Sequence, residues 1–100
     1  MGNGEGVVLR KRANLWRGSE SVGGHLTLTE ADLRFRAHRL NVQTQPLDIP
    51  ITEIVSLRKY NNMRIFPNGV AVMTVSGVEH RFVVGGRDRL IAAIEALRSR

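Results

Sequence analysis

Apolar and polar residues alternate with a period of two along most of this chain, the pattern of β-strands that bury one face. The clearest run is residues 33–38, where Leu33, Phe35 and Ala37 alternate with two arginines and a histidine. Comparable runs predict six further strands, over residues 7–16, 25–29, 47–51, 54–60, 70–75 and 78–84.

Turn-forming residues separate these runs. Residues 17–23 and 41–46 read as polar connections. Pro67-Asn68-Gly69 predicts a tight hairpin, because Asn-Gly tolerates positive φ. Before it, Asn61-Asn62 could interrupt the fifth strand and residues 63–66 could continue it. Pro50 cannot donate a ladder hydrogen bond, so its strand is expected at a sheet edge or a bulge.

The period changes near the C-terminus. Leu90, Ile91, Ile94 and Leu97 are spaced as one stripe of an α-helix, which predicts a helix near residues 87–98. A lone terminal helix with one apolar stripe must cover an open face or end of the sheet. The expected fold is therefore mainly β, a PH-like (pleckstrin-homology-like) seven-stranded antiparallel barrel or sandwich capped by one C-terminal α-helix.

Composition limits the classes of protein that fit. The chain of 100 residues makes one domain, with a flexible N-terminus at 1–6 and the folded part at 7–100. It has no cysteine, which removes disulfides, thiolate metal sites and cysteine nucleophiles. No apolar run reaches about 18 residues and no secretory signal is visible. We expect a cytoplasmic protein that could be peripheral at the membrane.

The residues carry no recognisable catalytic pattern. The three histidines lie on separate predicted strands, although His25 and His38 are expected to be neighbours. The acidic residues show no paired spacing, and no lysine followed by serine or threonine completes a phosphate loop. We therefore expect no enzyme activity, no metal site and no cofactor.

The charge balance is the one feature that points to a ligand. Fifteen basic residues against nine acidic ones give a net charge of +6, which favours anionic partners. By alternation, Arg10 and Arg12 leave the same side of the sheet as Arg34 and Arg36. A strand between them would hold the two pairs about 10 Å apart, with His25 in the middle. The candidate anion-binding residues are Arg10, Arg12, Arg17, His25, Arg34, Arg36, His38 and Arg39.

Aromatic residues are few. Trp16 adjoins the first turn and either caps the barrel or inserts into a membrane interface. Phe35 and Phe82 alternate with polar residues and belong to the core. No stacking platform for bases is apparent, which makes nucleic acid the least favoured partner.

Residues 23–35, Gly-Gly-His-Leu-Thr-Leu-Thr-Glu-Ala-Asp-Leu-Arg-Phe, resemble the core pattern of the bacterial GRAM-like domains of the pleckstrin-homology superfold. Residues 49–54, 67–69 and 81–84 are similar to later motifs of that family, so the resemblance covers about residues 4–97. Ala31-Asp32 departs from the usual residues at those positions. The resemblance implies a non-catalytic binding module for lipid or protein.

Three hypotheses remain open from the sequence. The first is docking on an anionic lipid head group or an acidic protein surface through the basic strand face. The second is a protein-interaction or self-association module that uses the strand edge near Pro50 or the cleft beside the helix. The third is nucleic-acid binding. A solvated arginine face without a ligand is the plain alternative to all three, and the oligomeric state is left open.

Overall fold

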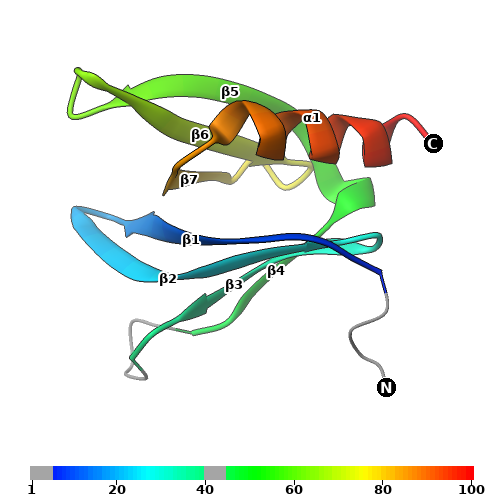
Figure 1. The fold of residues 1–100 in the computed structure, drawn as a ribbon, viewed down its shortest axis with the longest axis horizontal. Coiled ribbons are helices and arrows are strands. Elements are labelled where there is room, and N and C mark those ends of the chain that lie inside the picture. Colours follow the sequence, from blue (N-terminus) through cyan, green and yellow to red (C-terminus); the bar gives the residue numbers. More distant parts are fainter. Residues whose placement is uncertain (1–5, 40–44) are drawn as a thin grey trace.

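The computed structural model describes residues 6–39 and 45–100, in which one curled sheet packs against one α-helix (Figure 1). The fold class expected from the alternating pattern is confirmed. The elements are β1 (Val7–Arg17), β2 (Glu20–Thr29), β3 (Asp32–Ala37), β4 (Leu47–Pro50), the 3₁₀ turn η1 (Ile51–Glu53), β5 (Ile54–Asn62), β6 (Phe66–Thr74), β7 (Glu79–Val84) and α1 (Arg87–Arg98).

The strands form one antiparallel sheet in the order β4-β3-β2-β1-β7-β6-β5. β1 pairs with β2 along nearly its whole length, but it pairs with β7 only over residues 13–15. The sheet therefore folds over at this short seam, so that β1–β4 face β5–β7 across the core (Figure 1). α1 packs against β6, η1 and the β1 strand, and covers the open side between the two halves.

The core is aliphatic with two aromatic rings. Phe35 and Phe82 are both buried, and their ring centroids lie 6.1 Å apart. The apolar stripe of α1 enters the same core, with Ile94 fully buried and Leu90 only 2% exposed. The predicted orientation of these residues is confirmed.

Two local predictions need correction. β2 begins at Glu20, so residues 20–23 belong to a strand rather than to a turn. Residues 51–53 form a 3₁₀ turn that the alternation did not predict. Pro50 does end an edge strand, because β4 is the last strand on its side of the sheet.

The predicted hairpin at Pro67-Asn68-Gly69 is wrong, because these residues lie within β6 and the turn precedes them at 63–65. Gly69 serves packing instead. A Cβ at Gly69 would lie 2.5 Å from the ring of Tyr60, which covers the glycine and donates its hydroxyl hydrogen to the Phe82 carbonyl at 3.0 Å. Glycine here allows the close approach of a ring rather than a turn.

Candidate anion-binding face

The strand register brings the predicted arginines of β1 and β3 onto one outer face of the sheet. Arg10 lies opposite Thr27, which lies opposite Arg34, and the next row contains Arg12, His25 and Arg36. Because β2 lies between β1 and β3, the two arginine columns are about 10 Å apart, which is twice the strand spacing. We call Arg10, Arg12, His25, Arg34, Arg36 and His38 the basic face.

Acidic residues neutralise one side of this face. Asp32 contacts Arg34 at 2.9 Å, and Asp48 on the neighbouring β4 contacts Arg36 at 2.9 Å. Within the described ranges, Arg10 and Arg12 form no ion pair, and both are exposed. Among the arginines of the basic face, those of β1 are therefore the ones without an acidic partner in the described residues.

The histidines lie between the arginines. The rings of His25 and His38 meet edge to face with their centroids 4.9 Å apart, as expected for neighbours on adjacent strands. Partial burial lowers the pKa of His25 below its usual 6.5, and the charges of Arg10, His38 and Arg12 lower it further. A bound anion would reverse this electrostatic effect and favour the protonated ring.

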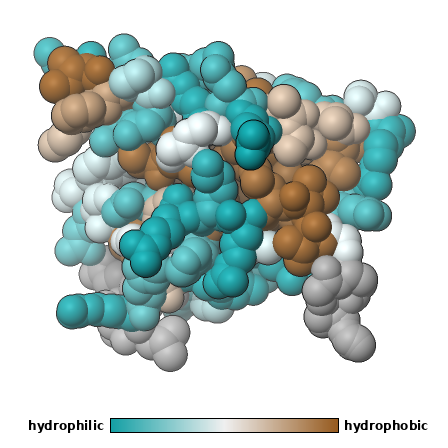
Figure 2. Space-filling model, in the orientation of Figure 1, coloured by the Kyte–Doolittle hydropathy of each residue, from teal (hydrophilic) through white to brown (hydrophobic). Residues whose placement is uncertain are grey.

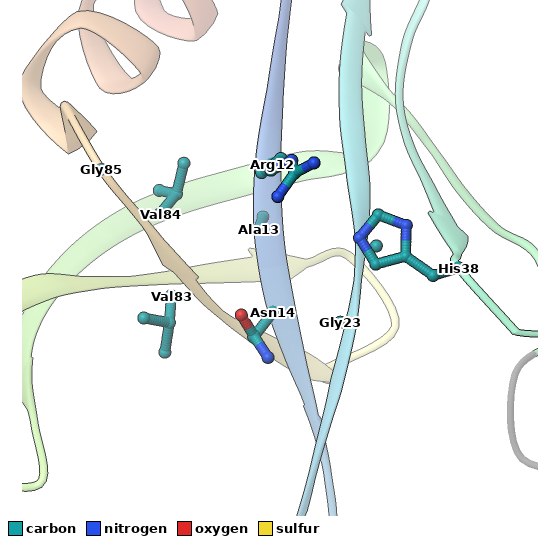
Figure 3. Close-up of a pocket in the computed structure, with 9 residues that line it drawn as sticks. Arg12, Ala13, Asn14, Gly23, His38, Val83, Val84 and Gly85 are labelled. Atoms are coloured by element: carbon teal, nitrogen blue, oxygen red, sulfur yellow. The ribbon is translucent and has the colours of Figure 1, made fainter.

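An open hollow of about 350 Å³ adjoins the basic face at the seam between β1 and β7. Figure 3 shows Arg12, Asn14 and His38 around it, with β7 on the opposite side. Gly23 forms part of its wall, and a Cβ there would lie 3.6 Å from His38 Cδ2. The missing side chain leaves room for a small group beside a guanidinium, an amide and an imidazole, a combination suited to phosphate oxygens.

The two remaining predicted residues are Arg17, which lies away from this face, and Arg39. Arg17 shares the side of β1 that carries Ala13 and Leu15, is half-buried, and donates from Nη2 to the Gln45 carbonyl at 2.8 Å. Together with burial, its charge lowers the pKa of His80. Arg39 is exposed directly before residues 40–44, which lie outside the described residues.

Two residues of the site were not predicted from the sequence. Asn14 lies on the same side of β1 as Arg12 and donates to Ser21 Oγ at 3.0 Å. Alternation alone could have placed it there. Asp48 could not have been found in this way, because its effect on Arg36 depends on the pairing of β3 with β4.

Other surfaces of the molecule were also candidates. A cleft of about 520 Å³ beside α1, which the second hypothesis anticipated, is lined by Ile51, Leu97 and Arg98 among others. No three metal-ligating side chains converge within residues 6–39 and 45–100. None of the helices described there is long and apolar enough to cross a membrane.

Comparison with known proteins agrees with this architecture. No curated protein matches the sequence. The C-terminal domain of an unknown protein from Leishmania infantum superposes with a TM-score of 0.83 at 20% identity, covering 97% of this chain and 87% of that one. The N-terminal PH domain of human ARAP2 gives a TM-score of 0.72 at 13% identity, with coverage of 98% and 84%.

A third solved structure, the Slm1 PH domain in complex with phosphoserine, gives a TM-score of 0.66 at 9% identity and covers 92% of each chain. At these identities the likeness establishes the fold alone. The model of the GRAM domain family matches residues 1–98 of the sequence. The chain therefore belongs to the GRAM domain family, a group of generally non-catalytic binding modules with the PH-like fold.

Proposed function

We propose that this domain docks on an anionic membrane surface through the β1 side of the basic face. The observation that carries the proposal is that Arg10 and Arg12 are exposed and have no acidic partner among the described residues, whereas the arginines of β3 are paired with acids. Arg12 also lines the hollow at Gly23. Unpaired arginines near an anionic bilayer contribute about 1 kcal/mol each to attraction. Arg12, Asn14 and His38 would then contact the phosphate of a head group.

Two further observations support an anionic ligand. The net charge of +6 attracts the domain to a negative surface before any contact forms. The Slm1 PH domain, a structural neighbour, was solved with phosphoserine, which pairs a phosphate with a serine as a phosphatidylserine head group does. This similarity suggests the ligand class and does not place a site in this chain.

Vesicle sedimentation tests the proposal. The wild-type domain should sediment with phosphatidylcholine vesicles that contain phosphatidylserine and remain in solution with pure phosphatidylcholine. Arg10→Glu with Arg12→Glu should weaken binding at least about tenfold, because reversal costs more than the loss of two attractions. Both side chains are exposed, so the melting temperature should change little.

The control is Arg89→Glu with Arg100→Glu, which changes the net charge equally at exposed positions on and after α1. Arg89 forms no ion pair among the described residues, and Arg100 contacts Glu30 at 3.7 Å. It should retain most of the binding. Equal losses in the two variants would show that only net charge acts. Binding to an acidic protein or to nucleic acid with no binding to vesicles would contradict the proposal in favour of the other hypotheses.

A further inference from the structure

The turn between β5 and β6 exposes apolar side chains outside the basic face. Met63 and Ile65 are each 70% exposed and Phe66 is 48% exposed. In Figure 2 the upper left corner of the molecule is hydrophobic, and Figure 1, in the same orientation, places the β5–β6 turn there. The three residues form a protrusion that contributes nothing to the core. We call residues 63–66 the hairpin tip.

The backbone of the hairpin tip is strained. Met63 and Arg64 have positive φ values of 52° and 70°, and the Ile65 amide donates to the Asn62 carbonyl at 3.3 Å. Two consecutive positive φ values are typical of the type I′ hairpin turn, which favours Asn-Gly. Bulky residues there cost on the order of 1–2 kcal/mol each. Folding alone does not account for a methionine and an arginine at these positions.

The surroundings of the hairpin tip are basic and amphipathic. A hollow of about 400 Å³ separates it from the β1–β2 turn, and the residues that line this hollow include Arg64 and Arg81 but no acid. Trp16 forms part of the wall and donates from Nε1 to Asn62 Oδ1 at 3.3 Å. Exposed apolar residues flanked by arginines and a tryptophan match the chemistry of a bilayer interface with anionic head groups.

The hairpin tip lies beside the end of β1, the strand that carries Arg10 and Arg12 of the basic face. Trp16 leaves β1 on the side that also carries Arg12 and Asn14, and it lies beside the hairpin tip. Trp16 follows Arg12 by four positions, a rise of about 13 Å along β1, so one membrane surface can contact both regions. A flat partner such as a membrane fits this arrangement better than a narrow protein ligand does.

We infer that the hairpin tip inserts into an anionic membrane, with Met63, Ile65 and Phe66 at the boundary of head groups and acyl chains. Arg64 and Arg81 remain at the level of the phosphates. This inference rests on the proposed function, since the basic face brings the domain to the membrane before the tip inserts. The apolar side chains of the tip would then add affinity that salt does not screen, whereas the arginine contribution is screened.

A single-cysteine label tests insertion directly, because the natural sequence has no cysteine. Met63→Cys carries an environment-sensitive fluorophore, and Val78→Cys on the β6–β7 turn, where the valine is 50% exposed, carries the same label as the control. With vesicles of phosphatidylcholine and phosphatidylserine, the label at position 63 should gain intensity and be quenched by lipids with nitroxide-labelled acyl chains. The label at position 78 should change little.

Sedimentation of the same samples separates the two proposals. If the labelled protein sediments and the label at position 63 stays in a watery environment, the insertion is refuted while membrane docking survives. If nothing sediments, the proposed function fails and the insertion with it. Insertion of both labels alike would show non-specific adsorption and would also overturn the inference.

Paired serine variants give an independent measurement. Ile65→Ser with Phe66→Ser should weaken vesicle binding about tenfold or more, and most of the remaining binding should disappear at high salt. Val75→Ser with Val78→Ser removes apolar area at similarly exposed positions, 66% and 50%, and should bind like the wild type. Equal binding by both variants would contradict a specific role for the hairpin tip.

Discussion

Two histidines couple the stability of this domain to pH. Partial burial lowers the pKa of His25 and of His80, and neighbouring positive charges act in the same direction. The unfolded chain therefore binds protons on these rings at a higher pH than the folded protein does. Their contribution to stability is complete above about pH 6.5 and is lost as the pH falls through their folded-state pKa values.

Urea unfolding should show a lower free energy of unfolding near pH 5 than near pH 7.5, a window that lies above the ordinary titration of aspartate and glutamate. The variant His25→Gln with His80→Gln should flatten this dependence. If the double variant retained the full pH dependence, other groups would be responsible. Stability that rises on acidification would contradict the assigned direction of both pKa shifts.

At the level of single residues, alternation predicted which side chains point outward but not what they touch. Arg10, Arg12, Arg34 and Arg36 looked equivalent in the sequence, and the register does place them together. Their difference comes from Asp32, which contacts Arg34, and from Asp48, which reaches Arg36 only because β4 pairs with β3. Such a contact between separate segments cannot be read from the residue pattern of one strand.

The helix is the element whose packing followed most directly from its pattern. Ile94 is fully buried in the middle of the apolar stripe. Ile94→Ala should therefore lower the free energy of unfolding by about 2–5 kcal/mol, measured by urea or thermal denaturation. Arg89→Ala, on the exposed side of the same helix, should change it by less than about 0.5 kcal/mol. Equal effects would mean that the helix is not docked as described.

The β5–β6 hairpin is the element that sequence reasoning placed wrongly. Asn68-Gly69 has the residues of a tight turn, but burial beneath Tyr60 outweighs that local preference. The turn forms instead at Met63-Arg64, which have poor turn propensity. Tertiary packing therefore decided the position of the turn, and no local pattern could have shown it.

Because the turn lies at Met63-Arg64, replacing these residues should change stability and vesicle binding in opposite directions. Met63→Asn with Arg64→Gly supplies the residues that positive φ favours, so the free energy of unfolding should rise by about 1 kcal/mol. The same change removes an apolar and a basic side chain from the hairpin tip, so vesicle binding should fall. Thermal melting and vesicle sedimentation measure the two effects. A lower free energy of unfolding would contradict the backbone strain at the hairpin tip. Unchanged vesicle binding would contradict the insertion.

In the whole molecule, the fold gathers basic residues that are scattered in the sequence into the basic face. The sheet folds over at the short seam where β1 pairs with β7, and the β5–β6 turn lies beside the end of β1. Arginines on β1 and apolar residues some fifty positions later are thereby brought close together. Vesicle binding could depend on the basic face or only on the total charge of the domain.

Replacing single acidic residues distinguishes these two cases by an increase in vesicle binding. Asp48→Asn releases Arg36 on the basic face, and Asp88→Asn releases Lys59 beside the start of α1, where the two groups contact at 2.8 Å. Each variant raises the net charge by one and frees one cation, so long-range attraction is matched.

If the basic face binds the membrane, Asp48→Asn should tighten binding to phosphatidylserine vesicles severalfold, in line with about 1 kcal/mol for one added arginine. Asp88→Asn should change it little. Equal tightening in vesicle sedimentation would show that the domain responds to its net charge alone, and the basic face would then be an ordinary solvated surface.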